Sequence, residues 1–288
     1  MKFAVMGGDA RLAQLCRLLH ADGHRVRTFA LERADKLDEA VASADCAECA
    51  RHADCVILPL PLSGRQGYLS TLLSAREVTL DEVFSSLPRG VPVCAGRVDD
   101  YAAECAKKYG VGLIDYFCRE ELCVMNAAAT AEGALELLIR ETPKTLLGSR
   151  VLVVGFGRIG RLLALRLQGM GCHVAVSSRK YADMAWCRAM GFEPLDTRAL
   201  EPHLGKFDMV VNTVPAAVLG EERLRLLREG SLCMDLASRP GGVDFAAAAR
   251  LGVHAIWALS LPGEVAPISA GEIIRDTIYN ILREQELM

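Results

Sequence analysis

A glycine-rich stretch, GFGRIG, follows a short apolar run and opens an amphipathic segment. This glycine spacing is typical of a turn that binds the pyrophosphate of a dinucleotide between a strand and a helix. The first glycine permits the tight turn, the second admits backbone amides to the phosphates, and the third lets helix and strand approach closely. The alternative is a glycine-rich turn that only packs. The predicted phosphate-binding residues are Gly155, Phe156, Gly157, Arg158, Ile159 and Gly160.

The end of the next strand-like run, VAVSSRK, is the predicted site of cofactor selection. About 20 residues beyond the glycines, an acid would bind the ribose 2′-hydroxyl of NAD. Ser177, Ser178, Arg179 and Lys180 stand there instead. Because a guanidinium pairs bidentately with a phosphate, these residues favour NADP, whose ribose carries a 2′-phosphate. A solvated basic turn is the alternative.

Two further turns come after predicted strands and would face the same crevice. The turn in DLASRPGGVDF places Arg239, with Ser238 beside it, where cofactor and substrate meet, and its glycines allow close approach. Arg239 is therefore the predicted clamp for a substrate carboxylate. In NTVP, Asn212, Thr213 and Pro215 are predicted beside the nicotinamide half of the cofactor. A strand-capping turn is the alternative for that segment.

These turns need a scaffold of alternating strands and helices. From Ser149 onward, continuous apolar runs alternate with helical segments, as in a parallel sheet covered on both faces. This predicts a doubly wound α/β domain. The first 120 residues repeat the alternation, and MGGDARLAQL runs through Gly7 and Gly8 into a helix. Leu12 stands where the dinucleotide pattern needs a glycine, so we predict a second Rossmann-like unit that holds substrate instead.

The predicted units are joined by a connector. One helix is expected to start near Asn126 and to end by Thr142, because the residue before Pro143 is biased out of the helical region. Prolines and a glycine at 262, 263 and 267 predict a rigid loop, and the amphipathic C-terminal segment predicts a helix that returns to the first domain. The expected domains are 1–125 with 268–288 for substrate, 126–148 as connector, and 149–267 for NADP.

Composition excludes several classes of protein. A net charge of -3 gives no general attraction to nucleic acid. The uncharged apolar runs are strand-sized, and MKFAVMGGDA passes directly into glycines and an acid, so we expect no membrane span, no signal peptide and a cytoplasmic location.

The 11 scattered cysteines predict buried free thiols rather than disulfides. Cys94, Cys123, Cys172 and Cys233 lie in apolar, strand-like surroundings. A CAEC pair, followed by a third cysteine, lacks histidines at ligand spacing, so no metal site is predicted. The members of this group are Cys46, Cys49 and Cys55.

Five motifs occur in a fixed order over nearly the whole chain: MGGDAR, TAEG, GFGRIG, DLASRPGGVDF and LPGEVAPISAG. In this combination the sequence resembles the A subunits of dipicolinate synthase from spore-forming bacteria. The resemblance implies formation of pyridine-2,6-dicarboxylate from a dihydro- or hydroxytetrahydrodipicolinate. It also implies a partner, the flavoprotein-like B subunit, and expression in the mother cell during sporulation. Forming the aromatic ring removes a hydride, which NADP⁺ can accept, and a proton.

A dianionic substrate would call for more cations and polar groups. Arg11, in GGDAR, is predicted as a second cation, and Ser63 and Thr130 as substrate-binding hydroxyls, although a lone serine is more often a turn residue. Asp9 and Glu132 are the expected candidates for proton transfer; capping of a helix is the alternative for both. The six histidines show no partner pattern, so none is predicted to be catalytic.

Two other functions remain compatible with the residues. One is a dehydrogenase of another small amino or hydroxy acid, because the fold alone does not select the substrate. The other is a non-catalytic NADP(H)-sensing protein whose partner carries the chemistry. Apolar faces on the C-terminal helix would permit a homo-oligomer.

Overall fold

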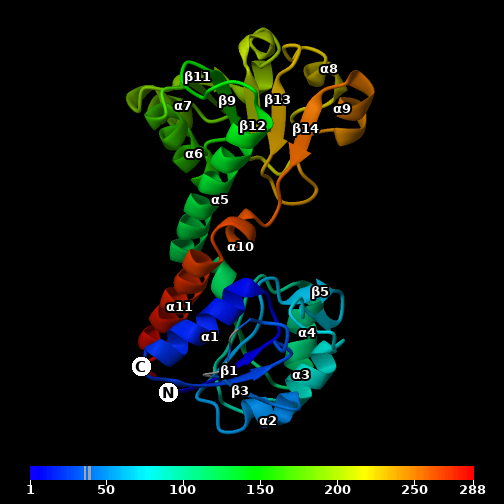
Figure 1. Ribbon diagram of the computed structural model, residues 1–288, viewed down its shortest axis with the longest axis vertical. Coiled ribbons are helices and arrows are strands. Elements are labelled where there is room, and N and C mark those ends of the chain that lie inside the picture. Colours follow the sequence, from blue (N-terminus) through cyan, green and yellow to red (C-terminus); the bar gives the residue numbers. More distant parts are fainter. Residues whose placement is uncertain (36, 38–39) are drawn as a thin grey trace. The chain divides into compact units, whose positions relative to one another are not determined.

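The chain folds into two α/β units. The computed structural model describes residues 1–35, 37 and 40–288. Unit 1 comprises Met1–Asn126 and Ala266–Met288, and unit 2 comprises Ala127–Val265. In each unit, helices flank a parallel sheet (Figure 1), which confirms the predicted fold of two Rossmann-like domains.

Unit 1 is built on a sheet with the strand order β3-β2-β1-β4-β7-β8, and all of its neighbouring strands are parallel. This order reverses between β1 and β4, which is where ligands bind in doubly wound sheets. The strands are β1 (Lys2–Met6), β2 (Arg25–Phe29), β3 (Val41–Ala42), β4 (Cys55–Ile57), β7 (Val93–Ala95) and β8 (Leu113–Asp115), with the separate hairpin β5 (Ser63–Arg65) and β6 (Tyr68–Leu69). The helices are α1 (Ala10–Ala21), α2 (Cys46–Ala50), α3 (Leu80–Ser86), α4 (Asp100–Lys108), the 3₁₀ turn η1 (Tyr116–Cys118) and α11 (Pro267–Glu284).

Unit 2 repeats the topology with the order β11-β10-β9-β12-β13-β14, again parallel throughout. Its strands are β9 (Arg150–Val154), β10 (His173–Ser178), β11 (Glu193–Asp196), β12 (Met209–Asn212), β13 (Leu232–Asp235) and β14 (His254–Trp257). Its helices are α6 (Arg158–Gly169), α7 (Tyr181–Ala189), α8 (Glu221–Leu224), α9 (Phe245–Leu251) and α10 (Leu261–Val265), with 3₁₀ turns η2 (Thr197–Ala199) and η3 (Leu204–Lys206).

The C-terminal helix α11 returns to unit 1, as predicted, and lies beside α1 (Figure 1). Its apolar face carries Ile274 and Ile278, which join the same buried cluster as Leu12 and Leu15 of α1. The two helices approach closely at Gly271, where a Cβ atom would lie 3.0 Å from the backbone oxygen of Arg11. The chain end is therefore an integral part of the N-terminal unit.

The connector helix is longer than predicted. α5 spans Glu120–Glu141, because Glu120 and Glu121 suit the first turn of a helix and extend it toward the N-terminus. An 18-residue window of α5 has a mean hydropathy of 1.4, so by length and composition alone this helix could cross a membrane, although no membrane span was expected. Its residues Ala131, Ala134 and Leu138 are fully buried in the core of unit 2. Packing inside a folded unit accounts for this apolar character.

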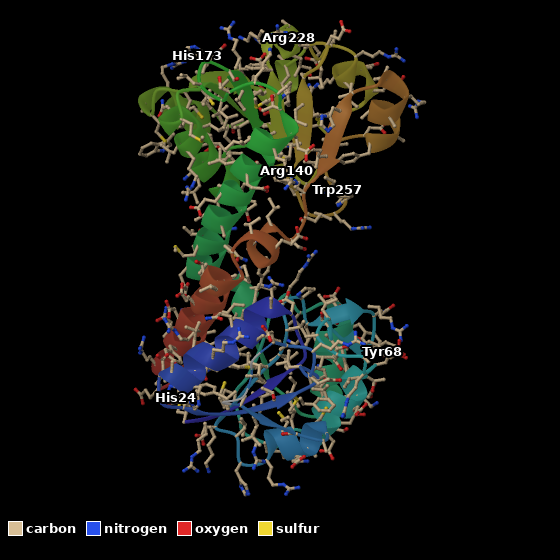
Figure 2. The ribbon with its side chains drawn as sticks, viewed as in Figure 1. His24, Tyr68, Arg140, His173, Arg228 and Trp257 are labelled. Carbon is tan, nitrogen blue, oxygen red and sulfur yellow. The ribbon has the colours of Figure 1, made fainter. Side chains whose placement is uncertain are left out.

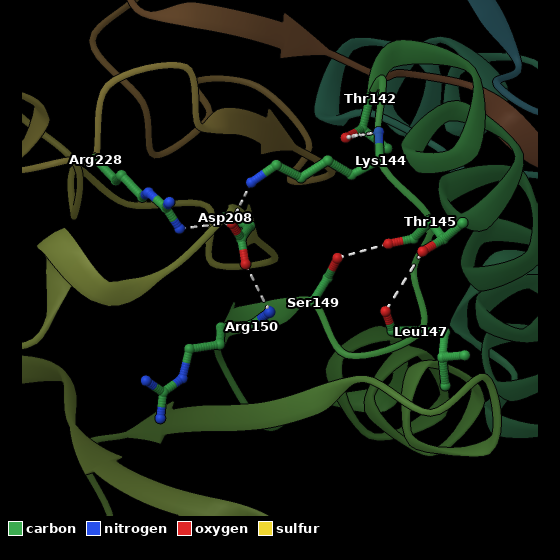
Figure 3. A network of polar contacts seen from close by, with 8 residues as sticks. All are labelled: Thr142, Lys144, Thr145, Leu147, Ser149, Arg150, Asp208 and Arg228. Atoms are coloured by element: carbon green, nitrogen blue, oxygen red, sulfur yellow. Dashed lines mark hydrogen bonds and ion pairs between the residues drawn. The ribbon is translucent and has the colours of Figure 1, made fainter.

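Asp208 attaches the segment after α5 to the sheet of unit 2 (Figure 3). Its carboxylate accepts hydrogen bonds from the backbone N–H of Arg150 at 2.9 Å, from Lys144 at 3.1 Å and from Arg228 at 2.8 Å. Burial raises the pKa of Asp208, but the Arg150 donor and the two cations outweigh burial, so its pKa lies below the usual value. Arg228 and His173 lie at the edge of unit 2 opposite to Trp257 (Figure 2), so this network braces the amino ends of the strands.

Three local predictions were wrong. The loop predicted around Pro262 and Pro267 contains α10, and α11 begins at Pro267, because proline is well tolerated in the first turn of a helix. The edge strand β11 was missed, since its sequence EPLD lacks an apolar run. Cys123 lies on α5 rather than in a strand and is only partly buried.

The CAEC pair lies on the short helix α2 with both thiols buried. Burial raises the pKa values of Cys46 and Cys49 to about 12, so both thiols stay protonated at neutral pH. Among the described residues, no group of histidines, cysteines and acids has the geometry of a metal site.

Candidate functional site

A cavity of about 530 Å³ lies at the carboxyl ends of β9, β10 and β12 of unit 2. It therefore occupies the reversal of strand order at which doubly wound sheets bind their ligands. The predicted cofactor residues that line it are Gly155, Phe156, Gly157, Ser177, Ser178, Arg179, Lys180, Thr213 and Pro215.

The glycine turn of this cavity has the geometry that a pyrophosphate requires. Gly155 has φ 102°, and a Cβ atom there would lie 2.5 Å from Thr213 Oγ1. A Cβ at Gly160 would lie 2.1 Å from the backbone oxygen of Gly155, so helix α6 can only approach the turn with glycine in this position. Gly157, in contrast, faces open space and caps α6 without any side-chain hydrogen bond. The N-cap residue thus supplies no side chain that would compete with a phosphate for the first turn of α6.

The end of β10 carries the predicted basic residues. Arg179 and Lys180 are exposed, whereas Ser178 is buried and its hydroxyl donates to Asp183 Oδ2 at 2.8 Å. Ser177 is fully buried and accepts a hydrogen bond from Thr197 at 3.1 Å, so its hydroxyl supports the turn. All four residues line the cavity, but the two serine hydroxyls are engaged within the protein whereas the two cations are exposed.

Three arginines that the sequence analysis did not select also line the cavity: Arg161, Arg198 and Arg223. Arg161 lies 3.8 Å from Asp183, and Arg198 binds Asp196 through two hydrogen bonds of 2.9 and 2.7 Å. The hydrogen bond from Arg198 is the main reason that the pKa of Asp196 lies below its usual value. Arg198 follows the unpredicted strand β11, so its position beside β10 could not be found without that strand.

Four predicted cofactor residues do not line the cavity. Arg158 is exposed on the first turn of α6, and Ile159 packs against the core of unit 2. Gly160 acts indirectly, by allowing α6 to approach the turn. Asn212 is fully buried: its amide donates to Asp235 Oδ1 at 2.8 Å and to the Val214 oxygen at 2.9 Å. The polar atoms of Asn212 are thus engaged within the protein, and its place beside the nicotinamide stays a prediction.

Asp235 also organises the turn that carries Arg239. This fully buried carboxylate accepts from the backbone N–H groups of Ala237 at 3.0 Å, Gly242 at 2.7 Å and Val243 at 3.2 Å. Sequence reasoning missed this role, although an acid at a strand end followed by two glycines was a usable signal. Asp235 therefore joins the turns after β12 and β13 into one polar network.

Arg239 is exposed at the tip of this turn, next to exposed Ser238. Its guanidinium carbon lies 5.5 Å from the ring centre of Trp257, whose indole N–H donates to the Ala237 oxygen at 3.0 Å. A Cβ at Gly241 would lie 2.9 Å from both Asp235 and Trp257, which explains the glycine there. The turn is thus held by buried groups while its arginine faces outward.

Two of the predicted residues of unit 1, Asp9 and Arg11, are engaged with one another. Asp9 caps α1, and Arg11 donates to its carboxylate through Nε at 3.1 Å and Nη2 at 2.7 Å, and also to the backbone oxygen of Leu60. The charge of Arg11 is therefore balanced by Asp9 rather than left for a ligand. Ser63 begins the hairpin strand β5, and its buried hydroxyl has no partner among the described residues.

Glu132 and Thr130 lie in the interior of α5, so neither caps a helix. The Glu132 side chain is 62% exposed and accepts from Arg166 of α6 at 2.9 Å. Glu132 thus belongs to unit 2, whereas Asp9, the other predicted proton acceptor, belongs to unit 1.

Comparison with known proteins separates the same two parts of the chain. Residues 2–117 match the N-terminal domain of the dipicolinate synthase A subunit, and residues 127–247 match the D-isomer specific 2-hydroxyacid dehydrogenase, NAD binding domain. The A subunit of dipicolinate synthase from Bacillus subtilis (strain 168) is 32% identical over 286 residues, which cover 99% of this chain and 96% of that protein. The chain belongs to the family of dipicolinate synthase A subunits.

Two solved structures of this family have the same fold. The A chain of dipicolinate synthase from Bacillus subtilis superposes with a TM-score of 0.88 at 32% identity, covering 99% of this chain and 96% of the other. The A subunit of dipicolinate synthase from Bacillus halodurans gives a TM-score of 0.89 at 29% identity, covering 98% and 97%. Membership of this family and the dehydrogenase-domain match support an oxidoreductase with a nicotinamide cofactor.

Proposed function

We propose that this protein is an NADP-dependent dehydrogenase that forms dipicolinate from dihydrodipicolinate or 4-hydroxytetrahydrodipicolinate. It would act with the B subunit of dipicolinate synthase in the mother-cell cytoplasm of a sporulating bacterium. The observation that carries the proposal is the similarity to a dipicolinate synthase A subunit over 99% of the chain. A homo-oligomer stays a prediction.

The choice of NADP rests on the charges at the adenosine end of the unit 2 cavity. Arg179, Lys180 and Arg198 line the part of the wall at the ends of β10 and β11. The acid in this wall, Asp183, is already engaged by Ser178 and lies near Arg161. Because Arg198 is paired with Asp196, the positive charge offered to a 2′-phosphate would come chiefly from Arg179 and Lys180, and an arginine fork suits the geometry of a phosphate.

Aromatising the ring of dihydrodipicolinate removes a hydride from one ring carbon and a proton from another position, and the hydroxytetrahydro form must also lose water. Bound NADP⁺ would supply the hydride acceptor. The protein has to hold the donor carbon in a fixed orientation, which substrate carboxylates make possible. Arg239, rigidly placed by the network around Asp235, is our proposed carboxylate clamp, with Ser238 beside it.

The proton acceptor is proposed to be Glu132 or Asp9. Glu132 has the stronger case by accessibility, since its side chain is 62% exposed and bonded to a single arginine. Asp9 is 23% exposed, and both of its oxygens accept hydrogen bonds from Arg11. Using Asp9 as a base would therefore require it to leave its cap and its ion pair.

The first experiment is to mix the purified chain with NADP⁺ and the freshly generated precursor, with and without the B subunit. Growth of the reduced-nicotinamide absorbance together with dipicolinate would support the proposed reaction and show which chain carries it. Dipicolinate without nicotinamide reduction would favour the NADP(H)-sensing alternative. Reduction with another hydroxy or amino acid, but not with the precursor, would favour the general dehydrogenase.

Replacing the proposed clamp separates substrate binding from cofactor binding. We expect Arg239→Ala to lower kcat/KM by roughly 100-fold or more, because two charge-assisted hydrogen bonds to a carboxylate are lost. The dissociation constant for NADP⁺ should stay unchanged. Arg250→Ala, which removes an exposed arginine bound to Glu221, is the matched control and should keep full activity. Loss of NADP⁺ binding in Arg239→Ala would contradict the clamp assignment.

A further inference from the structure

A second cavity, in unit 1, has a strongly basic wall and no part in the proposed reaction. It has a volume of about 260 Å³ and lies at the amino ends of β1 and β2, the sheet edge opposite to the Gly7–Gly8 turn. Phe3, Cys49 and Ala53 provide its apolar part. The basic residues in its wall are Lys2, Arg25, Arg27, Arg51 and His52.

The four lysine and arginine side chains of this basic cavity form no ion pair with any carboxylate in the described part of the chain. Two acids of neighbouring segments accept hydrogen bonds from backbone groups: Asp54 accepts from the N–H of Lys2 at 2.7 Å, and Glu48 accepts from that of Ala44 at 2.7 Å. Arg27 donates to the backbone oxygen of Glu48 at 2.8 Å, which fixes its guanidinium without neutralising it.

Other cations of unit 1 are paired differently. Arg11, Arg65, Arg76, Lys108 and Arg119 each lie within ion-pair distance of a carboxylate. Four cations around one small cavity repel each other, and a bound anion would reduce that repulsion. The cations of the basic cavity differ from these five in that they gather around one cavity without such ion pairs among the described residues.

The floor of the basic cavity strengthens its attraction for an anion. Phe3 and Cys49 are each only 1% exposed, so the charges face a region of low polarity on one side. Burial raises the pKa of the Cys49 thiol to about 12, so this residue adds no negative charge at neutral pH. Arginine guanidinium groups beside this apolar surface can each donate two parallel hydrogen bonds to the oxygens of a phosphate.

We propose that the basic cavity binds a small phosphate anion of the size of inorganic phosphate or pyrophosphate. Its volume is below the range of about 300–1,000 Å³ that is usual for sites holding whole organic ligands, which excludes a complete dinucleotide. The site lies at the opposite end of the strands from the Gly7–Gly8 turn and within the other unit from the nucleotide cavity. It is therefore independent of the proposed function.

The test is calorimetric titration of the full chain with pyrophosphate and, separately, with inorganic phosphate. We expect Arg25→Ala/Arg51→Ala to weaken binding by roughly 10-fold or more, since two charged contacts are removed. Both side chains are exposed, so folding should be preserved, and thermal unfolding checks this. Arg33→Ala/Arg89→Ala removes the same charge from exposed positions of unit 1 and should bind as the wild type.

A second pair of variants keeps the result interpretable. Arg27→Lys retains the charge but loses the fork, and we expect several-fold weaker pyrophosphate binding. Arg179→Ala/Arg198→Ala weakens the nucleotide cavity of unit 2 and must leave the unit 1 affinity intact. Pyrophosphate binding that disappears only in this last variant, or falls equally in the Arg33/Arg89 control, would overturn the proposal. Wild-type protein that binds neither anion would overturn it as well.

Discussion

Units 1 and 2 share strand order and a glycine turn after the first strand, yet the helices that begin at these two turns pack differently. In unit 2, Gly160 lets α6 lie against the turn, because any Cβ would meet the Gly155 oxygen at 2.1 Å. In unit 1, the corresponding place is filled by Leu12, whose side chain would lie 2.7 Å from a Cβ at Gly8. In unit 1 the side chain of Leu12 thus fills the space between helix and turn, whereas in unit 2 Gly160 leaves that space to the backbone of the turn.

The helix caps differ in the same direction. Asp9 caps α1 with its carboxylate and holds Arg11, so a negative group already occupies the N-terminus of that helix. Gly157 caps α6 with no side chain, so the cap itself places no negative group at the N-terminus of that helix. The same fold therefore has a helix N-terminus capped by a side chain in unit 1 and one without a side-chain cap in unit 2. The residue at the N-cap position makes this difference.

The largest effect is expected from adding a side chain at Gly160, where helix α6 meets the glycine turn of unit 2. Gly160→Ala should destabilise unit 2 by roughly 3 kcal/mol or more, because backbone atoms cannot yield to the new methyl group as a side chain would. Binding of NADP⁺ should be lost with it. Chemical unfolding and titration with NADP⁺ measure both effects.

Gly157→Ala is the matched control for this substitution. A Cβ at Gly157 meets no atom within 4 Å, so stability should change by less than about 1 kcal/mol. Affinity for NADP⁺ should nevertheless fall, because the methyl group enters the space expected for the phosphates. Equal stability losses in the two variants would mean that the contrast between the two glycines is not steric.

The next effect concerns cofactor choice. Arg179→Asp should weaken binding of NADP⁺ by about 100-fold and that of NAD⁺ by far less, because a carboxylate would face the 2′-phosphate. Dissociation constants for both cofactors test this. Arg188→Asp, the same change on an exposed position of α7, should alter neither. Equal losses for the two cofactors in Arg179→Asp would refute the 2′-phosphate role.

The smallest effect is expected from removing the side chain that caps helix α1 of unit 1. Asp9→Ala removes a helix cap and the partner of Arg11, and should lower the free energy of unfolding by about 1–2 kcal/mol. The NADP⁺ affinity of unit 2 should not change. Unfolding curves and binding stoichiometry check the prediction. A second equivalent of bound NADP⁺ would show that Asp9 alone had masked a nucleotide site in unit 1.

The regular elements and the phosphate turn could be predicted because their signals are local. Continuous apolar runs indicated the buried strands, and the glycine spacing indicated the turn after β9. Strand β11 escaped notice because EPLD carries no apolar run, and Arg198 was missed with it. The hydrogen bond between Asn212 and Asp235 could not be predicted, because it joins two residues that lie 23 positions apart in the sequence.

The sequence by itself determined the two-unit α/β fold, the returning C-terminal helix and the position of the dinucleotide turn, since periodicity and glycine spacing are properties of short segments. Only the tertiary structure decided which polar side chains remain available to a ligand. Arg11 and Asp9 neutralise each other, whereas Arg179 and Arg239 stay exposed, and the lysine and arginine side chains around the unit 1 cavity form no ion pair within the described part of the chain. Whether a charged side chain is ion-paired depends on the groups that the fold brings next to it, and these cannot be read from its neighbours in the sequence.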